Sequence, residues 1–167
     1  DGRTSSMCGN GGRCLVKFAQ DLGVITDSAS FIATDGEHKA LIKEGWVHLK
    51  MNKTELPVSK DKGHFLDSGS PHHVVQVEDC KTTEVFAEGR RMRTDIYGTE
   101  GANINFVERL DDASVFVRTY ERGVEDETYS CGTGVTASAI IAYKNNWVKT
   151  NEVNISTLGG ELKVAFE

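Results

Sequence analysis

The motif Cys-Gly-x-Gly occurs twice in this sequence, and each copy leads into a stretch with a helical pattern of apolar residues. The copies begin at Cys8 and at Cys131. Glycine lets a ligand approach the backbone closely, and the N–H groups and dipole of a helix N-terminus stabilise an anion such as a thiolate. The two copies therefore predict a pair of reactive cysteines at two helix starts, within an internally duplicated architecture.

The two expected helices differ in how much of their surface is apolar. After Cys131, small and apolar residues continue on nearly every side, which predicts a buried helix capped by Ser130 or Thr133 and ending near residues 145–146. After Cys8, the pattern predicts a helix with a single apolar face that ends before Gly23. This face comprises Cys14, Leu15, Phe18, Ala19 and Leu22.

Composition narrows the class of protein. The chain has 167 residues, 38% hydrophobic and 26% charged, as in ordinary globular proteins. Its net charge of −6 argues against a nucleic-acid surface, and no apolar run approaches the roughly 20 residues of a membrane span. The four cysteines show no disulfide framework and no secretory signal opens the chain, so we expect a reducing, cytoplasmic setting. Cys14, on an apolar face, and Cys80, in a polar turn, are expected to be structural or incidental.

Turn signals and alternating residues predict strands around the two helices. The Asp35-Gly36 and Glu44-Gly45 pairs predict two hairpin turns between strands within residues 30–51. Further strands are expected within 63–77 on either side of a tight turn, and at 103–107, 114–120, 153–156 and 161–166. A short amphipathic helix is expected at 82–92, with the basic cluster 89–93 at its solvated end. This order suits two sheets, each wrapped around one apolar helix.

A charged segment at residues 53–62, which carries Pro57, is the best candidate for a domain boundary. It divides the chain into the remainder of a first domain, residues 1–54, and a second domain, residues 55–167. The sequence starts at Asp1-Gly2-Arg3-Thr4 without a methionine or a preceding strand, and it ends at Glu167 within an expected strand. We therefore expect a piece of a longer polypeptide.

Two thiols at helix starts suit proton transfer at carbon. A thiolate removes a proton from one face of a stereocentre, and the other thiol delivers one to the opposite face of the planar carbanion. The titrations of such a pair are coupled. Backbone N–H groups of Gly9, Asn10, Gly132 and Thr133 would hold a carboxylate and receive the developing charge. No lysine lies in an evident pyridoxal-binding context, so the expected chemistry uses no cofactor.

Longer segments resemble the diaminopimelate epimerase family. The resemblance rests on residues 7–14 and 121–134, and on the turn 69–72 and the strand 103–107 that lie between them in the same order. It covers essentially the whole chain. It implies an α+β fold of two pseudo-symmetric domains, each a strand-rich, barrel-like sheet around a central buried helix, with the site in the cleft between them.

The resemblance also implies an activity and residue roles. The reaction would interconvert LL- and meso-2,6-diaminopimelate, a small amino acid on the route to lysine and peptidoglycan precursors. It needs no metal, nucleic acid or membrane partner, and the family resemblance allows a homodimer. The implied acid/base residues are Cys8 and Cys131, with His72 near one thiol and Glu121 near the other. The implied substrate-binding residues are Gly9, Asn10, Asn103, Glu121, Arg122, Gly132 and Thr133, with Glu121 on the α-amino group and Asn103 and Arg122 at the distal end.

The sequence departs from the family pattern in three places. Ser70 stands where many members have asparagine, so one distal contact would differ. Asp126 is an extra residue between Arg122 and Cys131. The family's leading segment and a closing strand are missing, and because a barrel without its first strands has open edges, we do not expect activity from this chain alone.

Other readings of the cysteines stay open. A non-catalytic anion-binding module would use the glycine-rich segments to hold a phosphate and would tolerate Cys131→Ser, although neither segment has a P-loop lysine. A proline or hydroxyproline racemase of the same fold shares the paired cysteines but typically has histidine where this chain has Asn10. A structural zinc site would need a shorter spacing than that of Cys8 and Cys14. Ordinary buried cysteines are the remaining alternative.

Overall fold

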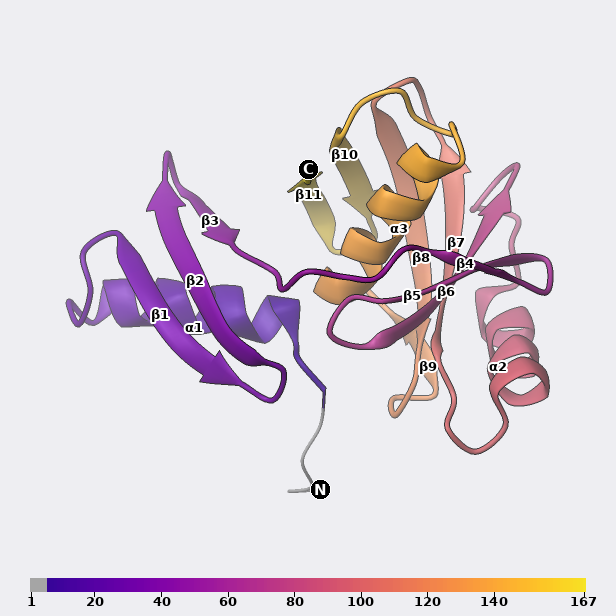
Figure 1. The fold of residues 1–167 in the computed structure, drawn as a ribbon, viewed down its shortest axis with the longest axis horizontal. Coiled ribbons are helices and arrows are strands. Elements are labelled where there is room, and N and C mark those ends of the chain that lie inside the picture. Colours follow the sequence, from indigo (N-terminus) through magenta and orange to yellow (C-terminus); the bar gives the residue numbers. More distant parts are fainter. Residues whose placement is uncertain (1–5) are drawn as a thin grey trace. The chain divides into compact units, whose positions relative to one another are not determined.

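The computed structural model describes residues 6–167. The opening residues Asp1-Gly2-Arg3-Thr4, for which the sequence predicts no preceding strand, lie outside the described part. The chain divides into two compact units (Figure 1). Unit 1 extends to Lys53 and unit 2 begins at Thr54, at the start of the charged segment that carries Pro57. Each unit has its own sheet.

Unit 1 consists of one helix and a three-stranded antiparallel sheet in the order β1-β2-β3. Its elements are α1 (Gly9–Asp21), β1 (Ser28–Ala33), β2 (Gly36–Lys43) and β3 (Trp46–Leu49). The predicted hairpin turns are confirmed: Gly36, Glu44 and Gly45 all have positive φ angles, as tight turns between twisted strands require. Helix α1 packs against β2 and β3.

The predicted apolar face of α1 does not pack against the sheet. Leu15, Phe18 and Leu22 are 52%, 61% and 62% exposed, and Cys14 is exposed as well. The helix instead contacts the sheet through its glycine side, because a Cβ atom on Gly12 would lie only 2.9 Å from the Phe31 ring. A residue larger than glycine at position 12 would hold the helix away from the sheet. The helix therefore packs with its Gly12 side against the sheet, and the large apolar side chains of the predicted face are exposed.

Unit 2 contains an eight-stranded mixed sheet whose main path runs β11-β10-β8-β7-β6-β5-β4, with β9 paired to β8. Its strands are β4 (Val58–Lys60), β5 (Gly63–Asp67), β6 (Pro71–Val77), β7 (Asn103–Arg109), β8 (Ser114–Glu121), β9 (Asp126–Thr128), β10 (Glu152–Thr157) and β11 (Gly160–Ala165). The predicted strands are confirmed, although the last one stops at Ala165 instead of Phe166. Strands β4 and β9 were not predicted, because β4 lies in the charged segment expected as a domain boundary and the three residues of β9 are polar.

Two parallel pairings, β6 with β7 and β8 with β10, define the topology of unit 2. Parallel neighbours need a crossover connection, and here each crossover contains a helix. The first is α2 (Val85–Tyr97) and the second is α3 (Gly132–Lys144). Helix α2 begins three residues later than predicted and runs further, so the basic cluster 89–93 lies in its middle.

The helices of unit 2 cover opposite faces of the sheet, and strand alternation assigns residues to each. On β7, Ile104 and Phe106 belong to the cluster under α2, whereas Val107 belongs to the cluster under α3. Helix α3 lies across the sheet and is buried along most of its length, as predicted (Figure 1). Its N-cap is Cys131 itself, so the expected cap at Ser130 or Thr133 is wrong. The α+β class is confirmed.

Candidate functional site

Cys8 is the N-cap residue of α1, with extended backbone angles (φ −114°, ψ 105°). Its Sγ accepts a hydrogen bond from the Gly11 backbone N–H at 3.3 Å, and its carbonyl oxygen accepts from Gly12 N–H at 2.9 Å. One N–H group of the first helical turn thus points toward the sulfur. Cys8 is exposed, while Gly9 is buried and the Asn10 side chain accepts from the Arg13 guanidinium.

Cys131 caps α3 with nearly the same backbone angles (φ −121°, ψ 113°). Its surroundings differ from those of Cys8: it is partly buried, and its Sγ lies 3.4 Å from the Thr133 hydroxyl. Thr133 and Gly132 are buried in the first turn of the helix. The Ser68 hydroxyl donates to the Thr133 carbonyl oxygen at 2.8 Å and so fixes this turn to the end of β5.

His72 connects Cys131 to the sheet through a set of hydrogen bonds that we call the His72 network: Thr119, Asn105, His72, Thr133 and Cys131. His72 Nε2 lies 2.9 Å from Thr133 Oγ1, and its Nδ1 lies 3.0 Å from Asn105 Nδ2. The Thr119 hydroxyl donates to Asn105 Oδ1 at 2.9 Å. Complete burial, together with the nearby Arg122 charge, lowers the pKa of His72 to about 3, so the imidazole is neutral.

Asn103 joins two other segments of the expected site. Its Nδ2 donates to Ser70 Oγ at 3.0 Å and to the Pro71 carbonyl at 3.1 Å, and its Oδ1 accepts from the Arg122 backbone N–H at 2.9 Å. The turn before β6 and the segment after β8 are therefore held together through one side chain. Asn103 is only 4% exposed.

The charged pair after β8 has partners within unit 2. Thr128 Oγ1 donates to the Glu121 carboxylate at 2.8 Å, which ties β9 to β8. The Arg122 guanidinium donates to the Glu100 carbonyl oxygen at 3.1 Å. Both side chains are half-buried.

The predicted site residues thus fall into two groups. Cys8, Gly9 and Asn10 belong to unit 1, and the others belong to unit 2. Within unit 2 the structure brings His72 and Thr133 together with Cys131, and Asn103 together with Arg122. Sequence reasoning missed Asn105 and Thr119. One signal was available, since Asn105 is two positions after Asn103 on a strand, but none of the three partners of Asn105 is near it in sequence.

The burial of two cysteines outside the Cys-Gly-x-Gly motifs differs from what their sequence surroundings indicated. Cys80 lies in a bend after β6, as its polar neighbours predicted, but it is fully buried in the cluster under α2, and its thiol donates to the carbonyls of Phe106 (3.5 Å) and Phe116 (3.7 Å). Burial, aided by the charge of Glu108, raises its pKa to about 12, so its structural role is supported. Cys14 is exposed, not packed on an apolar face.

Two further histidines, His38 and His73, are buried strand residues. His38 bonds to Asp35 (2.9 Å) and to the Lys50 carbonyl (3.0 Å); burial lowers its pKa, but these partners outweigh burial and raise it overall. His73 Nδ1 lies 2.7 Å from the Tyr97 hydroxyl. Burial lowers the pKa of His73 to about 4.

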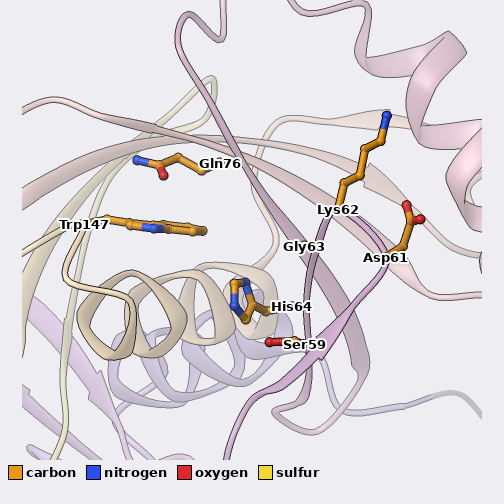
Figure 2. A pocket seen from close by; sticks show the side chains of 7 residues that line it. All are labelled: Ser59, Asp61, Lys62, Gly63, His64, Gln76 and Trp147. Carbon is orange, nitrogen blue, oxygen red and sulfur yellow. The ribbon is translucent and has the colours of Figure 1, made fainter.

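A shallow hollow on unit 2 lies apart from the predicted residues (Figure 2). Its lining comprises Ser59, Asp61, Lys62, Gly63, His64, Gln76 and Trp147. Within residues 6–167, no three His, Cys, Asp or Glu side chains cluster closely enough to hold a metal ion. In the same range, none of the helices has the length and apolar character needed to cross a bilayer.

The fold is shared with solved racemase, epimerase and PhzF-type proteins. A hydroxyproline epimerase from Agrobacterium vitis matches with a TM-score of 0.65 and 18% identity, over 99% of this chain and 59% of that one. A putative PhzC/PhzF protein from Clostridium difficile matches with a TM-score of 0.62 and 10% identity, over 95% of this chain and 65% of that one. At these identities the similarity defines the class of fold alone.

Sequence comparison identifies the family within this class. Residues 64–167 match the diaminopimelate epimerase family model. A diaminopimelate epimerase from Flavobacterium psychrophilum is 46% identical over 99% of this chain, and one from Aquifex aeolicus is 39% identical over 97%. The chain belongs to the diaminopimelate epimerase family. It spans 66% of the length of the Flavobacterium relative and 62% of the Aquifex one.

Proposed function

We propose that this chain carries the two acid/base cysteines of a pyridoxal-independent epimerase that interconverts LL- and meso-2,6-diaminopimelate. The observation that carries the proposal is that Cys8 and Cys131 each cap a helix with the same extended backbone geometry. A helix start stabilises a thiolate, and two such thiols provide the base and the acid that inversion at carbon requires. Family membership supports the substrate.

The proposed reaction moves one proton in each half. One sulfur, as the thiolate, takes the α-proton and becomes a thiol, and the C–H bonding electrons remain on the substrate as a carbanion conjugated with its carboxylate. The other sulfur, as the thiol, then gives its proton to the opposite face of the α-carbon and becomes the thiolate. The two sulfurs have exchanged protonation states, so the reverse reaction starts from the other cysteine.

Backbone and side-chain groups supply binding in this proposal. N–H groups in the first helical turns, at Gly9, Asn10, Gly132 and Thr133, hold the α-carboxylate and the charge that develops on it. Glu121 holds the α-amino group, and Asn103 and Arg122 fix the distal end. Because Asn103 already bonds to the Arg122 backbone, its most direct role is to position that segment.

The remaining assignments belong to the same proposal. Residues 1–54 and 55–167 are parts of two pseudo-symmetric, strand-rich domains. The protein is cytoplasmic, acts on a small amino acid in the supply of lysine and peptidoglycan precursors, and forms a homodimer. His72 serves the Cys131 side, because the His72 network ends at that sulfur.

Hydrogen exchange at the substrate α-carbon tests the proposed reaction. A protein that carries this chain at the full length of its relatives should exchange the α-hydrogen of diaminopimelate with solvent deuterium without added cofactor. Cys8→Ser and Cys131→Ser should each lower epimerisation by about a hundredfold or more, since each removes an acid/base group. Cys14→Ser, the matched control, should retain the wild-type rate. Exchange that survives both motif substitutions, or exchange of proline in place of diaminopimelate, would exclude the reaction proposed.

Thiol labelling gives an independent measurement on the same protein. Brief alkylation should label Cys8 or Cys131 and abolish exchange, whereas Cys80 should stay unlabelled until the protein is unfolded, because its thiol is buried. Peptide mass spectrometry locates the label. Inactivation accompanied by labelling of Cys80 alone would contradict the assignment.

A further inference from the structure

The orientation of the Asn105 amide follows from its partners. Its Nδ2 lies 3.3 Å from the His73 carbonyl oxygen, which can only accept a hydrogen bond. Its Oδ1 lies 2.9 Å from the Thr119 hydroxyl, which can donate. The opposite orientation would set two oxygens against each other at His73. Nδ2 therefore points toward His72 and donates its second hydrogen to His72 Nδ1 at 3.0 Å.

This donation determines which nitrogen of His72 carries the proton. A neutral imidazole has one accepting and one donating nitrogen. Because Nδ1 accepts from Asn105, the proton lies on Nε2, and Nε2 donates to Thr133 Oγ1 at 2.9 Å. Imidazole neutrality follows from the complete burial of His72 next to the positive charge of Arg122.

The direction of donation continues to the sulfur. Thr133 Oγ1 accepts from His72, so its own hydrogen remains for Cys131 Sγ at 3.4 Å. A thiolate can only accept, and the hydroxyl is therefore the donor whenever Cys131 is ionised. A hydrogen bond to a charged group is stronger than one between neutral groups, so this contact favours the thiolate over the thiol.

We propose that Asn105 and Thr133 are positioning residues for Cys131. Asn105 holds His72 in the Nε2-protonated tautomer, and the Thr133 hydroxyl, which accepts from His72 Nε2, donates its own hydrogen to the Cys131 sulfur. The network stabilises the thiolate at the start of α3. Use of this thiolate in catalysis rests on the proposed function, whereas the hydrogen-bond directions rest on geometry within unit 2 alone.

The tautomer is measured directly on the 167-residue chain. Two-bond ¹H–¹⁵N spectra of ¹⁵N-histidine-labelled protein distinguish the neutral tautomers, and a His72→Gln sample identifies the His72 signals among those of the five histidines. We expect the proton on Nε2 in the wild type and a mixture of tautomers in Asn105→Ala. A proton on Nδ1 in the wild type overturns the proposal. A single Nε2 tautomer retained in Asn105→Ala overturns the role of Asn105.

The effect on the sulfur is measured by iodoacetamide alkylation at neutral pH, with Cys8 of unit 1 as the internal reference in each sample. Thr133→Val keeps the shape but removes the hydroxyl, and should slow alkylation of Cys131 about tenfold or more. Thr133→Ser keeps the hydroxyl and should alkylate at the wild-type rate. Equal rates of Cys131 alkylation in Thr133→Val and the wild type would refute the role of the Thr133 hydroxyl. A Thr133→Ser variant that is alkylated as slowly as Thr133→Val would refute it as well.

Neither readout depends on substrate. Should Thr133→Val fail to give a native circular dichroism spectrum, the wild-type tautomer still decides the proposal. Absence of hydrogen exchange in the full-length protein, with the Nε2 tautomer present, would remove the proposed function and leave the network intact. The reverse result, exchange with a proton on Nδ1, would remove the network and leave the function.

Discussion

Gly134 is the residue on which the packing around Cys131 depends most closely. A Cβ atom there would lie 2.5 Å from Asn105 Oδ1, 3.2 Å from His72 Cε1 and 3.3 Å from Cys131 Cβ. None of these atoms has room to move, because the helix and the strands behind it are buried. Only glycine lets α3 begin this close to the His72 network.

Gly134→Ala should therefore lower the free energy of unfolding by about 1–3 kcal/mol, the usual cost of overpacking a core, although alanine favours helix formation. Urea unfolding followed by circular dichroism measures the change. Ser138→Ala is the control in the same helix: the buried Ser138 hydroxyl has no hydrogen-bond partner among residues 6–167, so its loss should be neutral or stabilising. A stabilising Gly134→Ala would mean that α3 moves away from the network.

Single-residue detail was only partly predictable from the sequence. The helix starts at Cys8 and Cys131 follow from local chemistry, since glycine and the apolar pattern act within a few residues. The partners of His72 do not, because they depend on the parallel register that sets His72 opposite Asn103, and Val74 opposite Asn105, across β6 and β7. The burial of Cys80 has the same origin, because a polar local sequence does not reveal two distant strands that cover it.

At the scale of elements, β6 carries two adjacent histidines to opposite faces of the sheet. His72 reaches α3 through Thr133, and His73 reaches α2 through Tyr97. Both are buried, and burial holds both neutral. The start of α2 and the side that α1 presents to the sheet were less predictable. Helix α2 starts later than expected, and α1 packs with its glycine side against the sheet, because tertiary packing decides both.

The buried histidines should make unit 2 less stable in acid. Their folded-state pKa values, about 3 for His72 and about 4 for His73, lie below the ordinary 6.5. Below pH 6.5 the unfolded chain binds protons that the folded chain does not, so the free energy of unfolding falls as pH falls toward 4, by about 1.4 kcal/mol per pH unit for each histidine. His73→Gln should reduce this slope by one histidine's share.

Urea unfolding between pH 6.5 and 4.5 measures the slope, with Trp147 fluorescence as the reporter in a Trp46→Phe background. Tyr97→Phe is the control: it removes the hydrogen-bond partner of His73 but keeps it buried, so the slope should persist at a lower overall stability. An unchanged slope in His73→Gln would show that the folded chain protonates this histidine as readily as the unfolded one.

At the scale of the whole molecule, the two units differ in the size of their cores. Buried side chains in unit 1 are few, and among the described residues they comprise Met7, Val16, His38 and Ala40. Unit 2 contains two clusters, one under each of its helices. Stability rises with the amount of apolar surface buried, so the smaller core should be the weaker one.

We therefore expect unit 1 to unfold at a lower urea concentration than unit 2. Each unit contains one of the two tryptophans, Trp46 in unit 1 and Trp147 in unit 2. Fluorescence of Trp147→Phe and Trp46→Phe variants reports the two units in turn, and residues 54–167 produced alone should retain the later transition. Coincident midpoints, or a disordered 54–167 fragment, would show that the units form one cooperative structure.

The glycine three residues after each motif cysteine has a consequence for chemistry at both sulfurs. A Cβ atom on Gly11 would lie 3.5 Å from Cys8 Sγ, and one on Gly134 would lie 3.3 Å from Cys131 Cβ. A side chain at either place would therefore extend from a point already in contact with the cysteine side chain. By helix propensity alone, a glycine costs a helix about 1 kcal/mol relative to alanine. At both helix starts the chain accepts this cost, and the space beside each motif cysteine stays free of another side chain.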